Sequence, residues 1–283
     1  MKAVITTLKK NFIEILFAGI SIYAILFGNF TKVKSPEIIF MNIGQGDAIL
    51  IQQNNFQILI DSGPDESIVY SLAKHMPWYD KNIEVLIITH PHEDHIGGIS
   101  SIYDKYHVEK IYYNHVEYRN STYEFIRTHY SDIMKSVVAG EYLKHKDISL
   151  LFIYPFKSNT EEIQNENINN ESVVTIVDIK GKKILLTGDA EKPVEKEIEE
   201  IISGEDIYIL KAGHHCSKTS TSETFLKAVN PTYAICSCGK ENKFGHPSHV
   251  LFHSSSRRQT LYDLLHERRL QSIPPLFQLH PVR

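Results

Sequence analysis

Short apolar runs separated by polar turns dominate the chain after residue 36. Runs rich in isoleucine, leucine and valine predict strands, which we place at 37–43, 48–52, 56–60, 85–88, 108–113, 148–153, 173–179, 183–186, 207–210 and 233–237. Helical periodicity predicts helices, which we place at 67–75, 97–103, 121–130, 193–202 and 223–229. The turn residues Asn54-Asn55 and Lys180-Gly181-Lys182 each predict a hairpin.

The order of these elements predicts an α/β fold. Each half of the chain has hairpin strands followed by alternating strands and helices, so we expect two sheets packed face to face with helices outside. No linker-like segment separates the halves, and we expect a single domain over residues 35–250. The polar stretch 158–170 predicts a surface loop.

The first 34 residues follow a different pattern. Residues 12–30 are almost wholly apolar, with Glu14 as the only charge, and the run is about long enough to cross a bilayer as a helix. No small-x-small cleavage motif follows, which favours an uncleaved transmembrane anchor over residues 1–34 rather than a cleaved signal. Lysines before the run favour a single-pass protein of the cell membrane with an extracytoplasmic domain, although the lysines after it oppose this orientation.

The last part, residues 251–283, differs in composition. Lysine does not occur after Lys243, and every basic side chain beyond residue 250 other than histidine is an arginine. This atypical tail is either a segment of different origin or an ordinary local fluctuation, and both interpretations stay open.

Charge and cysteine content narrow the class of protein only slightly. The formal net charge of −4 excludes an overall basic field of the kind that binds nucleic acid, but not a local basic groove. The three cysteines, Cys216, Cys236 and Cys238, are too few for a disulfide framework, so we interpret them as small buried apolar residues.

A histidine run directly after the strand at 85–88 is the strongest chemical signal. His90, His92, Asp94 and His95 occur within six residues, and imidazole and carboxylate groups bind divalent ions such as zinc or manganese. In an extended segment, alternate residues can converge, so we expect His90 and His92 to share one ion. Asp94 and His95 belong to the next turn and face a second position.

Three later strand ends carry further ligand types. Asp189 follows Thr187-Gly188 and is the candidate that bridges two ions, with a turn or helix-cap aspartate as the alternative. His214 and His215 end another strand, and His246 lies in a further loop. Asp61 follows an early strand, and we expect it to orient a ligand rather than bind an ion.

Together these segments resemble the metallo-β-lactamase superfamily. The motifs 42–48 (Asn-Ile-Gly-Gln-Gly-Asp-Ala), 186–189 (Leu-Thr-Gly-Asp), 213–220 (Gly-His-His-Cys-Ser-Lys-Thr-Ser) and 245–248 (Gly-His-Pro-Ser) look most like the extracytoplasmic domain of the ComEC competence proteins and their stand-alone relatives. The resemblance covers roughly residues 37–248. It implies an αββα four-layer sandwich, one or two divalent ions (zinc or manganese), and hydrolysis of a phosphodiester in DNA.

The resemblance also implies roles for individual residues. His90 and His92 would hold the first ion, Asp94 and His95 the second, and Asp189 would bridge them. Either His214 or His215 would complete the ligand set of the second ion. The family's third histidine for the first ion is missing from the segment 169–172, so we expect this ion to bind more weakly. Asn170 in this segment is expected to support the ligands.

One residue departs from the family pattern, and one neighbouring segment offers a possible additional contact to substrate. Cys216 stands where the branch usually has glycine, and it could crowd the turn or act as a soft metal ligand. Lys218, Thr219 and Ser220 could hold a phosphate at a helix start, or simply cap that helix.

The catalytic candidates are Asp94 and His246, with His246 as a phosphate ligand or proton donor.

Three functions stay open: a metal-dependent phosphodiesterase or nuclease acting on DNA, a metallo-hydrolase of a cell-envelope phosphoester, lactone or thioester, and a non-catalytic membrane-anchored binding module. The expected partners are DNA or another phosphodiester, and the membrane through the N-terminal helix. The sequence makes no prediction of the oligomeric state.

Overall fold

The computed structural model describes residues 12, 14–21, 23, 34–157, 167–239, 242–248 and 277–279. Met1–Ser35 and Pro36–Arg283 form two separate compact units. In the first unit, residues 14–21 are helical, and within the described part of the chain no helix has the length and apolar character needed to cross a membrane. Most of the predicted anchor lies outside the described residues, so the anchor stays a prediction.

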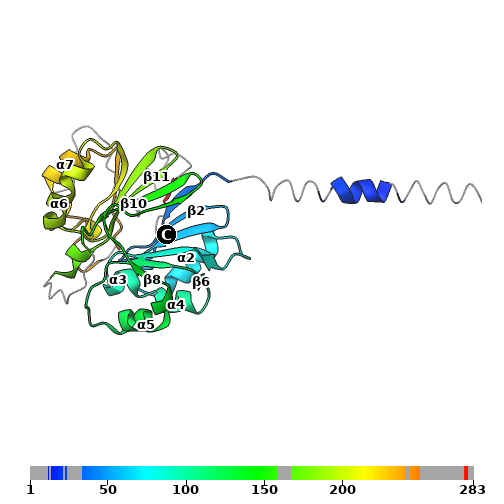
Figure 1. The fold of residues 1–283 in the computed structure, drawn as a ribbon, viewed down its shortest axis with the longest axis horizontal. Helices are drawn as coiled ribbons and strands as arrows, with labels where there is room; N and C mark the ends of the chain where they lie inside the picture. Colours follow the sequence, from blue (N-terminus) through cyan, green and yellow to red (C-terminus); the bar gives the residue numbers. More distant parts are fainter. Residues whose placement is uncertain are drawn as a thin grey trace, which may run out of the picture. The chain divides into compact units, whose positions relative to one another are not determined.

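Two sheets form the centre of the second unit (Figure 1). The first has the order β15 (Phe277–Leu279), β1 (Glu37–Phe40), β2 (Ile49–Gln53), β3 (Phe56–Ile60), β5 (Val85–Ile88), β7 (Ile111–Tyr113) and β8 (Met134–Ser136). The second has the order β14 (Tyr233–Ile235), β13 (Ile207–Lys211), β12 (Lys182–Leu186), β11 (Val174–Ile179), β10 (Ile148–Tyr154) and β9 (Tyr142–His145). A small pair, β4 (Asn82–Ile83) and β6 (His107–Val108), lies apart from both sheets.

Helices cover the outer face of each sheet. The first sheet is covered by α2 (Ser67–His75), α3 (Glu93–Ile96), α4 (Ile99–Tyr103) and α5 (Ser121–His129). The second is covered by α6 (Lys192–Ile202) and α7 (Glu223–Val229). Among the described residues, this unit also has three short 3-10 turns: η1 (Ser131–Ile133), η2 (Ile168–Glu171) and η3 (His214–Cys216). The layers are therefore helix, sheet, sheet, helix, as the resemblance implied.

Strand alternation explains why the layers form. In β1, Ile38 and Phe40 pack into the core between the two sheets, whereas Ile39 packs against the helices. β2 repeats this pattern, with Ile49 and Ile51 in the core between the sheets. Because successive side chains of a strand point to opposite faces, an all-apolar strand buries both faces and needs a layer on each side.

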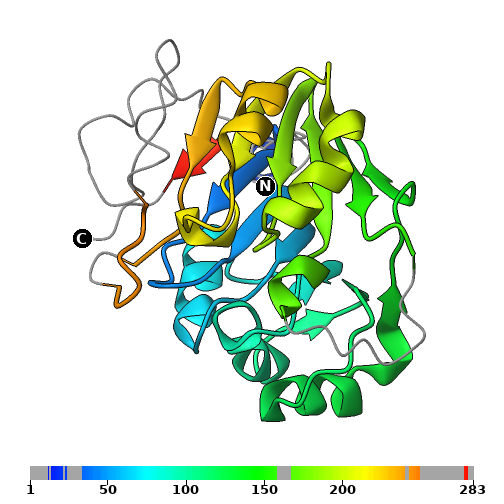
Figure 2. The ribbon, with the colours of Figure 1, turned by 90° about the vertical axis from the view of Figure 1, so that its left-hand side faces the viewer.

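Most predicted elements occur within a few residues of their expected positions. The hairpin of β2 and β3 and the helix α2 are confirmed. The predicted strand 108–113 is instead two short strands, β6 and β7, and the pattern missed β4, β8, β9 and β15. β15 comes from the segment predicted as an atypical tail and pairs in parallel with β1 (Figure 2), so the tail contributes an edge strand to the sheet.

Both sheets direct their carboxyl ends to the same region. β3, β5 and β7 are parallel neighbours in one sheet, and β12, β13 and β14 are parallel neighbours in the other. Asp61 follows β3, His90 follows soon after β5, Asp189 follows β12, and His214 follows β13. Segments far apart in the sequence thus meet at one end of the sandwich, where open α/β sheets place their chemistry.

Candidate metal centre

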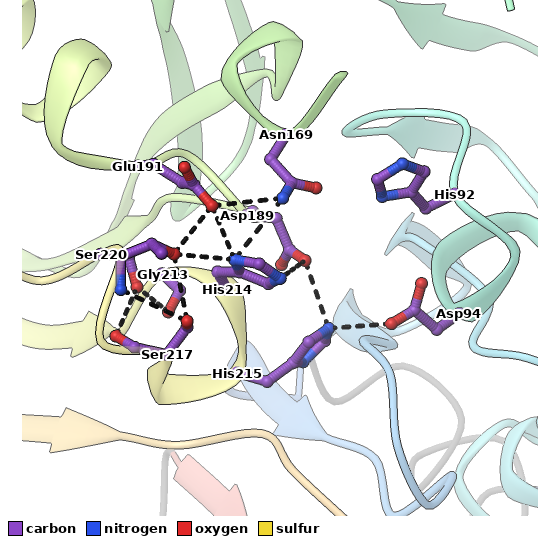
Figure 3. Close-up of polar contacts among 12 residues, drawn as sticks. His92, Asp94, Asn169, Asp189, Glu191, Gly213, His214, His215, Ser217 and Ser220 are labelled. Carbon is purple, nitrogen blue, oxygen red and sulfur yellow. Dashed lines mark hydrogen bonds and ion pairs between the residues drawn. The ribbon is translucent and has the colours of Figure 1, made fainter. Parts of the chain in front are cut away.

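Four predicted ligands form one compact cluster. Asp94, His95, Asp189 and His215 each place a ligand atom within 4.8 Å of the others. Oδ2 of Asp189 lies 3.3 Å from Nε2 of His95 and 3.3 Å from Nε2 of His215. Nε2 of His215 also lies 3.1 Å from Oδ2 of Asp94 (Figure 3). The sequence left open which histidine of the pair His214-His215 joins this set, and the structure assigns His215.

The cluster fits a divalent ion. Nε2 of His95 is buried and forms an ion pair with Oδ2 of Asp189 at 3.3 Å, but it makes no well-aligned hydrogen bond among the described residues, although polar atoms in such positions normally do. Two imidazoles and two carboxylates are a ligand set that suits zinc and also manganese. An ion between these groups would take the place of the proton on this nitrogen and offset the charge of the two carboxylates.

Asp61 holds His95 in orientation. Its Oδ2 lies 2.7 Å from Nδ1 of His95, which leaves Nε2 of that ring facing the cluster. Thr89 anchors the same carboxylate through its backbone N–H at 2.8 Å and its hydroxyl at 2.7 Å. Burial raises the pKa of Asp61, and the charge of His95 only partly offsets this. Asp61 is placed to orient a ligand, the role that we expected from the sequence.

The two histidines of the cluster hold protons tightly when no ion is bound. Burial alone lowers the pKa of His215, but the charge of Asp189 and hydrogen bonds to Asp189 and Asp94 outweigh it and raise this pKa to about 10. His95 has a pKa well above its ordinary value, because Asp189 and Asp61 likewise overcome the effect of burial. The pKa of Asp189 is well below its usual range, since the charges of His215 and His95 outweigh its burial.

Gly46 allows the Asp94 segment to come close. A Cβ at this position would lie 2.2 Å from the backbone oxygen of Asp94, which is a severe overlap. The next residue, Asp47, donates its backbone N–H to the same oxygen at 3.2 Å. The Gly-Gln-Gly-Asp turn therefore supports the start of α3, on which Asp94 and His95 lie.

Lys211 is a fully buried cation behind the cluster, and the sequence did not reveal it. Its Nζ forms an ion pair with Asp47, donates to the carbonyl of Gly188 at 2.8 Å and lies 3.6 Å from Oδ1 of Asp189. Burial alone lowers the pKa of Lys211, but Asp47 and Asp189 raise it, so the side chain is charged. Oδ1 of Asp189 thus faces Lys211, while Oδ2 faces the ligands.

The predicted first ion site is less complete. Nε2 of His90 lies 3.0 Å from Nδ1 of His92 and 4.0 Å from Oδ2 of Asp189. Ser172 supports the ring of His90 at 3.3 Å through its hydroxyl. Burial lowers the pKa of both His90 and His92, which keeps them neutral and able to bind a metal. These two histidines do not belong to the cluster of four.

Asn169 occupies the segment that lacks the third histidine. Its Oδ1 is buried without a hydrogen-bond partner among the described residues, and Figure 3 shows this oxygen on the side of His92. Its Nδ2 lies 3.4 Å from Oε1 of Glu191 and 3.5 Å from Nδ1 of His214. The neighbouring Asn170 instead accepts the backbone N–H of Glu191 at 3.1 Å through its Oδ1.

Glu191 orients His214. The sequence predicted a role for His214, but not its contact with Glu191. Oε1 of Glu191 lies 3.0 Å from Nδ1 of His214 and accepts the hydroxyl of Thr219 at 2.7 Å. Nε2 of His214 lies 3.9 Å from Oδ2 of Asp189, on the edge of the cluster. Glu191 follows Asp189 by two residues, but nothing in the sequence distinguishes it from an ordinary acidic residue at the start of a helix.

The remaining candidates lie around this edge. The ring centroid of His246 is 6.0 Å from that of His214, and burial lowers the pKa of His246. Ser220 donates its buried hydroxyl to the carbonyl of Gly213, and Lys218 is exposed. The hydroxyls of Thr219 and Ser220 therefore have partners within the protein, and the predicted phosphate contacts stay a prediction.

The cysteine prediction was right about burial and wrong about bonding: all three cysteines are buried in one apolar cluster, but two of them are bonded to each other. Cys216 and Cys236 form a disulfide with a Cα–Cα distance of 5.7 Å, and Cys238 is a buried thiol outside this bond. Cys216 is therefore neither a metal ligand nor a simple apolar filler. This disulfide was hard to predict from the sequence, because the two cysteines are 20 positions apart and an odd number of cysteines does not indicate which of them pair.

Fold and site together define an αββα domain with a cluster of residues that could hold a metal ion. Residues 41–150 match the family model described as the Metallo-beta-lactamase superfamily, and the chain contains a domain of this superfamily. Two solved structures share the fold. One is the metallo-beta-lactamase fold protein YhfI from Bacillus subtilis (TM-score 0.53, 12% identity, 80% of this chain and 94% of that chain). The other is a putative metal-dependent hydrolase from Parabacteroides distasonis (TM-score 0.51, 16% identity, 81% of this chain and 96% of that chain).

Three named relatives indicate which members of the superfamily the chain resembles in sequence. The chain is similar to ComE operon protein 3 of Bacillus subtilis, with 27% identity over 237 residues, 75% of this chain and 29% of the relative. It is also similar to Recombination protein 2 of Haemophilus influenzae, with 30% identity over 252 residues, 85% of this chain and 30% of the relative. A third relative, Competence protein ComA of Neisseria gonorrhoeae, is 28% identical over 211 residues, 74% of this chain and 28% of the relative. The chain thus spans less than a third of the length of each.

Proposed function

We propose that this domain is a metal-dependent phosphodiesterase that acts on DNA. The observation that carries the proposal is the cluster of Asp94, His95, Asp189 and His215 at the carboxyl ends of the strands. DNA is supported as the substrate by the names of the relatives, two of which are called a competence protein and a recombination protein. Because these relatives are much longer than the chain, their activities come to it only as part of this proposal.

The residues of the cluster would hold one divalent ion, zinc or manganese, and His90 and His92 would hold a second one less tightly. When bound, such an ion polarises a phosphoryl oxygen and lowers the pKa of water from 15.7 to about 7. Asp61 keeps the ring of His95 in place at 2.7 Å. Lys211 holds one oxygen of Asp189 away from the ligands and places a permanent positive charge behind the site.

His214 is the best-placed proton donor for the leaving oxygen. Glu191 binds its Nδ1 at 3.0 Å, which directs Nε2 to the edge of the cluster. A histidine held by a carboxylate in this way can transfer a proton from a defined atom. His246 lies beside His214 and remains a candidate for contact with the phosphate.

The proposal includes the location of the domain. We place it at the outer face of the cell membrane, held by an anchor in residues 1–34. The apolar composition of residues 12–30 supports the anchor. The Cys216–Cys236 disulfide supports an oxidising surrounding, since such bonds persist outside the cytoplasm.

Metal content and substrate choice test the function together. The full chain, purified in detergent with zinc and manganese supplied, would be assayed by elemental analysis. It would then be tested on single-stranded DNA, duplex DNA, bis(p-nitrophenyl) phosphate, a lactone and a thioester. We expect at least one bound ion and cleavage of the phosphodiesters, with Asp189→Asn losing both and the exposed Asp104→Asn losing neither.

Other results would point elsewhere. Bound metal with hydrolysis of only the lactone or thioester would replace DNA by an envelope substrate. No bound metal, combined with DNA binding that Asp189→Asn leaves unchanged, would identify a binding module without hydrolase activity.

A further inference from the structure

The disulfide lies directly behind a metal ligand. Cys216 is the residue after His215, and Cys236 is the residue before Ser237. The bond therefore connects the turn that presents His215 to the segment that leaves β14. The two bonded cysteines are buried in a small cluster with Ala212 and Cys238.

The same two segments are also connected through the ring of His215. Nδ1 of His215 donates to the carbonyl of Ser237 at 2.8 Å, and this leaves Nε2 to face Asp94 and Asp189. The hydroxyl of Ser237 donates to the carbonyl of Gly46 at 2.9 Å. Because Gly46 lies against Asp94, the position of Ser237 is coupled to two ligands of the cluster.

The turn that carries His215 has an unfavourable backbone. His214, His215 and Cys216 have φ angles of 45°, 52° and 64°, so three successive residues with side chains are left-handed. L-residues other than glycine rarely adopt this conformation. The turn consequently needs contacts that hold it, and the bond to Cys236 supplies a covalent one at its last residue.

We propose that the Cys216–Cys236 disulfide is a positioning element of the metal site. It holds the left-handed turn against the Ser237 segment, so that the nitrogen of His215 stays on the ion. Oxidised chain forms the complete site, and reduced chain holds the ion less tightly. The inference rests on the metal site of the proposed function.

Reduction can be carried out without changing the sequence. With a trialkylphosphine and water, the sulfur–sulfur bond breaks and each sulfur takes up a proton. Phosphorus takes the oxygen of the water and is oxidised by two electrons to the phosphine oxide. The products are two thiols, so the number of thiols per chain should rise from one, Cys238, to three.

The test compares metal affinity in the two redox states. The full chain, purified in air, is expected to show one thiol under denaturing conditions. Zinc affinity, measured by competition with a chromophoric chelator, is expected to fall about 10- to 100-fold on reduction, the range for losing a partner that orients a metal ligand. In cobalt-substituted protein, the visible absorption spectrum should change as the geometry around the ion changes.

Variants distinguish the effect of losing the disulfide from any direct effect of the reductant. Cys216→Gly suits the left-handed φ of this position and should bind zinc as weakly as the reduced wild type, with no further effect of phosphine. Cys238→Ser removes the cysteine outside the bond and should behave as wild type in both states. Circular dichroism of each protein would show that the fold is retained.

Several outcomes would overturn the inference. Three thiols in air-purified protein would show that the bond does not form, and unchanged zinc affinity after full reduction would show that it does not position His215. Amide hydrogen exchange of residues 212–217 provides a readout without metal, and we expect it to be faster in reduced chain. If neither form binds metal, faster exchange supports the positioning while the proposed function fails, and unchanged exchange overturns the positioning as well.

Discussion

His214 and His215 are neighbours in the chain but face different partners. Nδ1 of His214 lies 3.0 Å from the carboxylate of Glu191, whereas Nδ1 of His215 lies 2.8 Å from the carbonyl of Ser237. The left-handed backbone of both residues turns the two rings apart. As a result, His215 joins the ligand cluster and His214 lies at its edge.

The two histidines should therefore differ in what they contribute. His215→Ala is expected to lose most of the bound metal, because it removes one of four clustered ligands. His214→Ala should keep the metal but lower kcat on DNA about 10²- to 10⁴-fold, the range for a general acid. Bis(p-nitrophenyl) phosphate has a good leaving group and should lose much less. Equal loss of metal in both variants, or equal loss on both substrates, would contradict these assignments.

Glu191 should act through His214 alone. Glu191→Gln removes the charge beside Nδ1, and we expect about a 10- to 100-fold lower kcat on DNA with metal content unchanged. The double variant His214→Ala/Glu191→Gln should be no worse than His214→Ala, as a double-mutant cycle would show. Additive losses in the cycle would mean that Glu191 has another role.

The Asp47–Lys211 pair should matter more for stability than surface pairs do. Lys211→Met leaves the buried carboxyl group of Asp47 without its ion-pair partner Lys211, and we expect about 3–5 kcal/mol less free energy of unfolding in urea titrations. The double variant Asp47→Leu/Lys211→Met should recover part of this loss. Lys227→Met breaks the exposed pair with Glu223 and should leave the free energy of unfolding nearly unchanged. A similar cost for both lysines would refute the buried-charge explanation.

Metal binding should release protons. Without an ion, the raised pKa values of His215 (about 10) and His95 keep both rings protonated at neutral pH. Each must lose its proton to bind an ion, so affinity should rise with pH, by up to about 100-fold per unit if both protons leave together. Calorimetry in buffers of different ionisation enthalpy would count them. Affinity independent of pH between 6 and 9 would contradict the protonated state.

The same pKa shift has an opposite effect on metal-free protein. His215 has a folded pKa above its ordinary value of 6.5, so its ion pairing stabilises the fold fully below pH 6.5. This stabilisation is lost as the pH rises through about 10. Chelator-treated protein should therefore melt at a lower temperature at pH 10 than at pH 7, and a higher melting temperature at pH 10 would be inconsistent with the pairing.

Asn169 offers a gain-of-function test. Its amide oxygen is buried, lies on the side of His92 and has no hydrogen-bond partner in the described part of the chain; the segment is the one in which a third histidine is absent. Asn169→His should supply that ligand and raise the bound metal from about one to about two ions per chain by elemental analysis. Asn170→His is the matched control and should not add an ion, since Asn170 binds the backbone of Glu191 instead. Unchanged stoichiometry in Asn169→His would show that this position does not face the first site.

The layers of the fold could be predicted from the sequence because they depend on local periodicity. Ile38, Phe40 and their alternating neighbours make both faces of β1 apolar, and this pattern is visible without the structure. The strands β8 and β9 were missed because their residues are polar or half-exposed. β15 was missed because its pairing with β1 spans most of the chain.

By itself, the sequence determined the histidine run, the strand-end aspartates and the two-sheet pattern, since each of these is a feature of adjacent or periodic residues. Only the tertiary structure decided that His215 rather than His214 joins Asp94, 121 positions away. It also decided that Lys211 pairs with Asp47, that Glu191 holds His214 and that Cys216 is bonded to Cys236. The contacts of His215 and Lys211 join segments of the two different sheets, whereas those of Glu191 and Cys216 join the ends of neighbouring strands in one sheet. No spacing within the chain records which of these segments will be neighbours.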